Sequence, residues 1–260
     1  MKSAEQSAGF KPTGNFAHSD TRVAAYYRCY YTGKLELPET YSGLDLRQGT
    51  KVGCSLDERK YDVFFYPIEA VASGHAPVTK TLESATTARI ATVVPHEDFH
   101  AQIETLPEPI AEAAATLIGF AVADEVVPGN GSDVDLFLAK ALLINRYFDQ
   151  LRAVYRTDRA HALDRKATLF DALGEECKAI AGNPRSFDKC VSAPNNAGLA
   201  FDYTYTRYYP LLYRVFAACS RDTKRAVGVI VNAPPKRPES EVVAYFENFI
   251  SSTVSHTRSD

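Results

Sequence analysis

Residues 96 to 100 read His-Glu-Asp-Phe-His, a pattern of side chains that can hold a metal ion. On a helix, residues i and i+4 lie above one another on one face, so the imidazoles of His96 and His100 would point at one place. Glu97 sits one position round the helix, within reach of a water on the metal. This is the HExxH pattern, in which two histidines bind zinc and the glutamate acts as general base. The competing interpretation is a helix with two solvated histidines beside an acidic pair.

A catalytic zinc site needs a third protein ligand and an open position. After the motif the chain reads AQIETLPEPIAEAAATLIGF, in which Pro107 and Pro109 end one helix and begin another. Two helices joined by so short a turn should pack antiparallel, which favours Glu112 as the third ligand. Glu104 and Glu108 are the competing carboxylates. The alternative for Glu112 is an acidic residue that stabilises a helix N-terminus without any metal.

The segment before the motif is expected to contribute a strand and a proline-containing helix. Pro95 directly precedes His96, and apolar residues at helical spacing on both sides of it predict a helix that continues through the proline with a kink. Residues 61 to 68, YDVFFYPI, have the aromatic and β-branched content of a strand. A strand beside an active-site helix can pair with an extended peptide. His75 follows in a loop and is a candidate substrate-binding residue, although an ordinary glycine-containing turn is the favoured interpretation.

Composition limits the class of protein. The chain has 260 residues, 45% of them hydrophobic, which is enough for one sizeable core. No linker or repeat divides it, so we expect a single domain over residues 18–255 after a flexible segment, residues 1–17. The net charge of −3 comes without a basic stripe, which argues against a nucleic-acid partner. No apolar run is long enough for a transmembrane segment, and the polar N-terminus has no signal-peptide core, so the protein is either cytoplasmic or its leader is absent from this chain.

The five cysteines show no ligand spacing typical of a structural zinc site. Cys177 and Cys190 flank a Gly-Asn-Pro turn and are placed to form a disulfide in an oxidising compartment. The odd number leaves at least one thiol free.

The remaining sequence is dominated by helical patterns. Ser19 or Asp20 caps an expected helix that Gly33 ends. A long helix is expected from Asp133, the start of a helical C-terminal part, followed by another from about residue 161 and by helices around residues 199–219 and 238–252. The predicted fold class is therefore mostly α with a small β element (α+β).

Residues 194–216 are rich in asparagine and tyrosine and read PNNAGLAFDYTYTRYYPLLYRVF. Asn195 and Asn196 are candidates for binding the amino group or backbone of a peptide, or they cap a helix. A tyrosine hydroxyl near the metal would stabilise an oxyanion, whereas most of these tyrosines are expected to pack the core.

With these residues assembled, the chain resembles the bacterial predicted zinc aminopeptidases of the HExxH class, members of the gluzincin group. The likeness is carried by DVFFYPIEAVASGHAPVTKTL, by HEDFHAQ, by EAAATLIG, and by a helical hairpin followed by NNAGL and Tyr205. It covers about residues 61–216. Asp98 and Phe99 stand where the family prefers Leu-Ala, Ala111 replaces an Asn, and Pro95 is atypical.

The resemblance implies a zincin-like fold and one zinc ion per chain, bound by His96, His100 and Glu112, with Glu97 as base and Tyr205 near the site. The expected function is a zinc metallopeptidase, a hydrolase acting as an aminopeptidase or small-peptide protease, with a peptide substrate. The alternatives are a non-catalytic zincin-like binding or scaffold protein and a zinc hydrolase of non-peptide amides. Family members often carry an export signal, which favours a periplasmic or secreted location over a cytoplasmic one.

Overall fold

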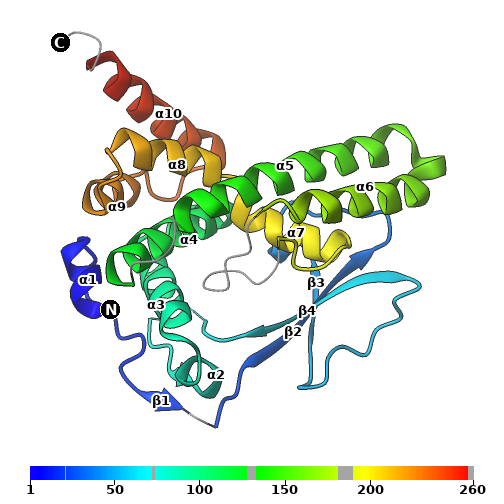
Figure 1. Ribbon diagram of the computed structural model, residues 1–260, viewed down its shortest axis with the longest axis horizontal. Helices are drawn as coiled ribbons and strands as arrows, with labels where there is room; N and C mark the ends of the chain where they lie inside the picture. The colour runs from blue at the N-terminus through cyan, green and yellow to red at the C-terminus, as the bar shows by residue number, and fades with distance from the viewer. Residues whose placement is uncertain (21, 72–73, 128–132, 181–189, 257–260) are drawn as a thin grey trace.

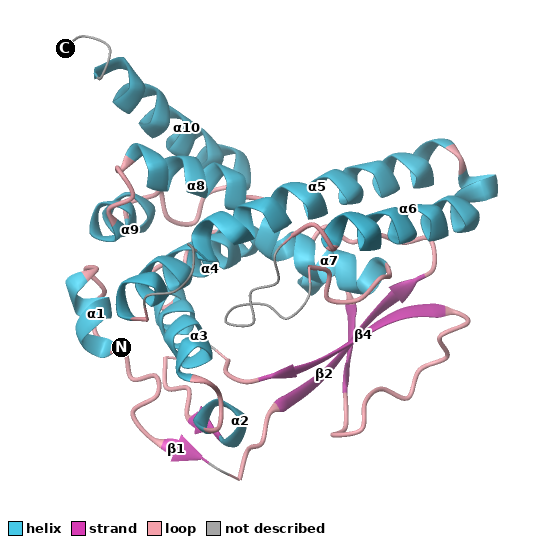
Figure 2. Ribbon diagram, in the orientation of Figure 1, coloured by secondary structure: helices cyan, strands magenta, loops and turns pink. Residues whose placement is uncertain are grey.

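The computed structural model describes residues 1–20, 22–71, 74–127, 133–180 and 190–256, and there helices outweigh a small sheet, as in an α+β protein (Figures 1 and 2). The helices are α1 (Lys2–Ser7), α2 (Lys80–Glu83), α3 (Thr87–His100), α4 (Glu108–Val126), α5 (Asp133–Thr157), α6 (Ala162–Cys177), α7 (Asn196–Thr206), α8 (Tyr209–Ala218), α9 (Thr223–Val231) and α10 (Glu239–His256). The strands are β1 (Ser19–Asp20), β2 (Tyr26–Gly33), β3 (Asp45–Gln48), β4 (Tyr61–Ile68) and β5 (Val78–Thr79). No described helix is long and apolar enough to cross a bilayer.

The main sheet has the order β3-β2-β4 and is antiparallel throughout. Strand β4 has the predicted bounds, but the helix expected from Ser19 or Asp20 to Gly33 is wrong, because β2 occupies its second half. Strand β2 pairs with β4 over its whole length, and Tyr30 lies opposite Phe64. Both rings are buried against Phe201 of α7. Aromatic pairs of this kind stabilise a sheet and outweigh the helical interpretation of the segment.

Helices α3 and α4 form an antiparallel pair at the centre of the molecule, beside the sheet (Figure 1). Thr86 caps α3 by accepting a hydrogen bond from the backbone N–H of Arg89. Pro95 lies inside α3, which continues through it as predicted. The pair is close at Gly119, where an added Cβ would lie 3.1 Å from the carbonyl oxygen of Thr92 and 3.2 Å from the Cβ of His96. A small residue at this point therefore determines how near the metal motif can lie to α4.

The C-terminal part is helical, as expected. Helices α5 and α6 pack as a long hairpin, α7 lies between that hairpin and the sheet, and α8, α9 and α10 form a separate corner (Figure 2). The single helix expected around residues 199–219 is two helices, since Pro210 starts the first turn of α8, and α9 was not predicted.

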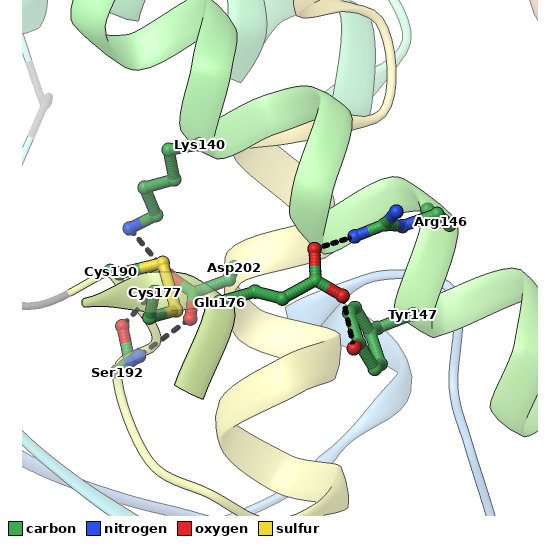
Figure 3. The surroundings of a disulfide bond; sticks show 8 residues. All are labelled: Lys140, Arg146, Tyr147, Glu176, Cys177, Cys190, Ser192 and Asp202. Atoms are coloured by element: carbon green, nitrogen blue, oxygen red, sulfur yellow. Dashed lines mark hydrogen bonds and ion pairs between the residues drawn. A yellow bond between two sulfur atoms is a disulfide. The ribbon is translucent and has the colours of Figure 1, made fainter. Parts of the chain in front are cut away.

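Two disulfides are present, and Figure 3 shows the surroundings of one of them, Cys177–Cys190. Cys177–Cys190 is the predicted pair, and it joins the end of α6 to the segment before α7, while the turn expected between the two cysteines lies outside the described residues. Next to this disulfide, Ser192 donates from its backbone N–H and its hydroxyl to Asp202 of α7. Cys29–Cys54 was not predicted, and Cys219 is a buried free thiol.

The first seventeen residues pack against the domain, which differs from the flexible segment expected from sequence. Phe10 is buried with its ring centroid 5.1 Å from that of Phe99. Asp98, which is 1% exposed, accepts hydrogen bonds from Lys2, Thr13 and Asn15. The sequence contains no sign of this arrangement, because the partners of Asp98 lie more than 80 residues before it in a segment without periodicity.

Candidate metal centre

Three potential metal ligands meet where α3 packs on α4. The Nε2 atoms of His96 and His100 are 3.2 Å apart, and they lie 3.5 and 3.3 Å from Oε2 of Glu112. The antiparallel hairpin predicted from the Pro-Glu-Pro turn thus brings Glu112 across from the histidine pair. Glu104, the competing carboxylate on the first helix, is exposed beyond the end of α3.

These separations fit a tetrahedral metal ion. Two atoms that each lie about 2.1 Å from one zinc ion, at a tetrahedral angle, are about 3.4 Å apart. All three observed separations are within 0.2 Å of this value. Oε2 of Glu112 is also buried and accepts no hydrogen bond, although a buried carboxylate oxygen without a hydrogen bond is energetically costly; the two imidazole nitrogens are its ion-pair partners. Two imidazoles and one carboxylate are, moreover, a donor set found in catalytic zinc sites.

The electrostatics of the group favour a positive charge at its centre. Burial opposes ionisation of Glu112, but the facing imidazoles outweigh it and hold the pKa of this carboxyl well below its usual range. Burial likewise disfavours a charged His100, but the Glu112 carboxylate outweighs that effect and raises the pKa of the imidazole. The carboxylate is thus ionised over the whole physiological pH range and attracts any cation that enters.

Tyr41 is part of the site and was missed from sequence. Its hydroxyl donates a hydrogen bond of 2.9 Å to Oε1 of Glu112, the oxygen that does not face the histidines. Burial, followed by the charges of Glu112 and Glu108, raises the pKa of the Tyr41 phenol far above its usual value, so it remains a donor. A hydrogen bond to the outer oxygen of a ligating carboxylate fixes the orientation of that ligand. No local signal marks Tyr41, which begins a short 3-10 helix, Tyr41–Gly43, 71 residues before Glu112.

Glu97 and Tyr205 lie beside the three ligands. Burial lowers the pKa of His100, and the charge of the half-buried Glu97 adds to that of Glu112 in raising it. Burial raises the pKa values of Tyr205 and Tyr66, and the charge of Glu97 adds to this effect. The ring of Tyr205 lies 6.4 Å from that of His96, centroid to centroid. Its hydroxyl makes no hydrogen bond within the described part of the chain, so it is available to a ligand.

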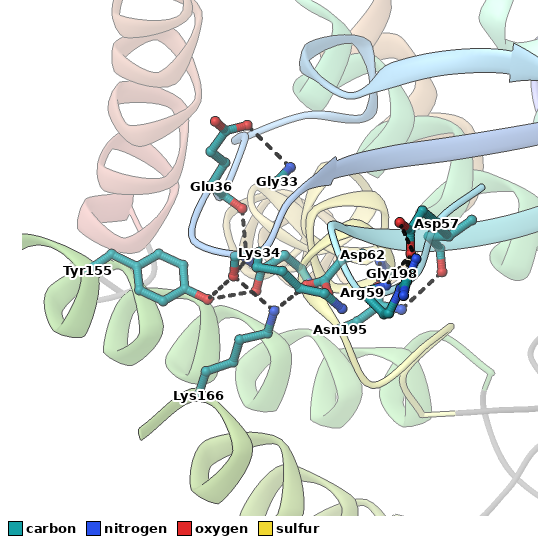
Figure 4. Close-up of polar contacts among 12 residues, drawn as sticks. Gly33, Lys34, Glu36, Asp57, Arg59, Asp62, Tyr155, Lys166, Asn195 and Gly198 are labelled. Carbon is teal, nitrogen blue, oxygen red and sulfur yellow. Dashed lines mark hydrogen bonds and ion pairs between the residues drawn. The ribbon is translucent and has the colours of Figure 1, made fainter. Parts of the chain in front are cut away.

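The two asparagines proposed to bind substrate have structural hydrogen bonds (Figure 4). Asn195 caps α7 by accepting from the N–H of Gly198, and its amide donates to the carbonyl of Val63. Asn196 is fully buried and donates to the backbone carbonyls of Lys34 and Glu36. Both side chains hold α7 against the start of the sheet, as the capping interpretation of the sequence allowed.

His75 does not lie with the metal ligands in this structure. It is exposed, and its Nδ1 lies so close to Gly14 that a Cβ added there would approach it to 2.4 Å. The structure therefore brings together five of the residues considered from sequence, His96, Glu97, His100, Glu112 and Tyr205, and leaves Asn195, Asn196 and His75 outside the group.

Comparisons of the chain with protein-family models, with curated proteins and with solved structures give no match. The resemblance to the predicted aminopeptidases therefore stays a prediction, and the function has to be argued from the site alone.

Proposed function

We propose that the protein is a zinc-dependent hydrolase of peptide bonds with a zincin-like active site. The observation that carries this proposal is the convergence of three lone-pair atoms, from His96, His100 and Glu112, at separations typical of one tetrahedral ion. A zinc ion bound there would polarise the scissile carbonyl and lower the pKa of a water molecule.

The residues around the ligands have the types and positions that hydrolysis needs. Glu97 directly follows His96, so its carboxylate would lie near a bound metal ion without being a ligand, which suits a base that takes a proton from water and returns it to the leaving amine. Tyr205 has a free hydroxyl beside His96 and is proposed to donate to the oxyanion of the tetrahedral intermediate. Tyr41 already donates to Glu112 and is assigned a positioning role instead.

The two disulfides support a location in an oxidising compartment. Structural disulfides persist in the periplasm or outside the cell and are rare in the reducing cytosol. Cys29–Cys54 and Cys177–Cys190 each tie a loop to a regular element, so we propose a periplasmic or secreted protein. Retention of both disulfides in protein isolated under thiol-blocking conditions would support this, and free thiols at all five positions would refute it.

The first experiment is elemental analysis of purified protein, with His100→Ala and Glu112→Ala beside the wild type. About one zinc per chain, lost in both variants, is the expected result. Absence of zinc from wild-type protein that has been reconstituted with zinc would refute the proposal.

The second experiment separates catalysis from metal binding. Glu97→Gln keeps the size of the side chain and removes the base, so it should keep its zinc and lose activity on a peptide library by roughly 100-fold or more. Full turnover by this variant would refute the role of Glu97. A zinc-loaded wild type that cleaves no peptide but hydrolyses other amides would indicate an amidase, and one that cleaves nothing would favour a binding protein.

A further inference from the structure

Helix α4 presents a row of unpaired polar atoms toward the metal centre. Four buried side-chain oxygens have no hydrogen-bond partner in the described part of the chain, and three of them belong to Glu108, Glu112 and Thr116. These residues are spaced by four, so they lie above one another on one face of α4. The middle residue, Glu112, is the candidate metal ligand, so Glu108 and Thr116 lie one helical turn before and after it on the same face of α4.

Glu108 differs from the other carboxylates near the metal centre. Its Oε1 is buried and accepts no hydrogen bond, and neither of its oxygens forms an ion pair with a described residue. Glu69, by contrast, is paired with Arg89 at 2.8 Å, and Glu104 is exposed. A charged acceptor that is buried without a donor costs more than a first-turn carboxylate gains from the helix dipole, so helix stabilisation alone does not account for it.

The position of Glu108 next to Tyr41 links it to the ligands. The Tyr41 hydroxyl donates to Glu112, and the negative charge of Glu108, like that of Glu112, raises the pKa of the same phenol. Tyr41 has a single proton to donate and gives it to Glu112. Glu108 is thus an acceptor without a donor. It lies one helical turn, about 5.4 Å, from the candidate ligand Glu112.

We propose that the Glu108 carboxylate binds the free α-ammonium group of the substrate, so that the site selects peptides with an unblocked N-terminus. This inference rests on the peptidase function proposed above. In an N-terminal residue the ammonium nitrogen lies no more than about 4 Å from its own carbonyl oxygen, by the bond lengths of the main chain. A carboxylate one turn from Glu112 is at a suitable distance to hold that ammonium while the carbonyl meets the metal. The ammonium would give Glu108 a charge-assisted hydrogen bond.

The test compares Glu108→Gln with Glu104→Gln as a matched control, since both change one carboxylate on the same stretch of chain and Glu104 is exposed. The substrates are leucine 4-nitroanilide and N-acetyl-leucine 4-nitroanilide, with zinc-loaded protein. The wild type and Glu104→Gln should prefer the free amine. Glu108→Gln should lose about 10- to 100-fold in kcat/KM on the free amine, mainly through KM, and stay unchanged on the acetylated substrate.

A second measurement keeps the inference independent of turnover. Leucine hydroxamate and N-acetyl-leucine hydroxamate both have a metal-binding group, and calorimetry on the zinc-loaded protein measures the affinity of each. If the wild type cleaves nothing but prefers the free amine, and Glu108→Gln loses that preference, the ammonium site stands while the peptidase function fails. Equal binding of both hydroxamates by the wild type, or an equal loss for both substrates in Glu108→Gln, overturns the inference.

Discussion

The hydrogen bond from Tyr41 to Glu112 predicts how strongly the surroundings of the metal centre contribute to zinc affinity. Tyr41→Phe removes the hydroxyl and keeps the ring in its aromatic contacts with Tyr30, Phe201 and Tyr205. The bond, 2.9 Å long and made to a buried charged acceptor, is worth about 1.5–3 kcal/mol. Since every 1.4 kcal/mol changes a binding constant about tenfold, the affinity for zinc should fall roughly 10- to 100-fold.

The assay is a competition between the protein and a chromophoric zinc chelator, which reports the dissociation constant of the apoprotein for zinc. The matched control is Tyr213→Phe, because the Tyr213 hydroxyl also donates to a carboxylate, that of Asp135, at 2.6 Å, but on the exposed surface of the C-terminal helices. This control should bind zinc as tightly as the wild type. The far-ultraviolet circular dichroism of both variants should match that of the wild type.

Two results would refute this reasoning. If Tyr41→Phe binds zinc with unchanged affinity, the outer oxygen of Glu112 needs no donor to orient it. If Tyr213→Phe weakens zinc binding by the same factor, the effect reflects general stability and not the orientation of a ligand.

Two further outcomes follow from the packing around α3. Burial, and next the charge of Asp98, raise the pKa of Glu5 from 4.5 to about 7, so the folded protein binds more protons than the unfolded chain between these values, and stability should fall as pH rises through that window, by up to about 3 kcal/mol. Urea unfolding at pH 5 and pH 8 should show this fall in the wild type and not in Glu5→Gln, and a pH-independent wild type would contradict it. Gly119→Ala places a methyl group 3.1 Å from the Thr92 carbonyl and 3.2 Å from the His96 Cβ, so it should move α3 and weaken zinc binding in the chelator assay, although alanine favours a helix by about 1 kcal/mol over glycine. Unchanged zinc affinity would mean that α3 yields without moving its ligands.

The grouping of His96, His100 and Glu112 could be predicted because their spacing along the chain is local. His96 and His100 are one turn apart on one helix, and the Pro-Glu-Pro turn keeps Glu112 within twelve residues of the second histidine. The long helix beginning at Asp133 and the strand from Tyr61 to Ile68 were predicted for the same reason, since periodicity and composition reveal them without any partner.

The parts that could not be predicted depend on distant contacts. Tyr41 becomes a site residue only when the segment after β2 folds against α4. Strand β2 lies where the sequence predicts the end of a helix, because its local sequence is compatible with either form and pairing with β4 decides between them. Residues 1–17 lack any periodic pattern, yet Phe10 and Asn15 become buried when they meet α3.

The contacts of Asp98 have a thermodynamic consequence for the metal centre. Asp98 lies two residues from each histidine, about 200° round the helix from them, so one side of α3 carries the ligands and the opposite side receives the N-terminal segment. Coupling between two binding events is reciprocal. Any factor by which zinc binding changes the docking of residues 1–17 on α3 is therefore also the factor by which that docking changes the affinity for zinc. A substitution in the N-terminal segment that alters zinc affinity would reveal such a coupling without touching a ligand.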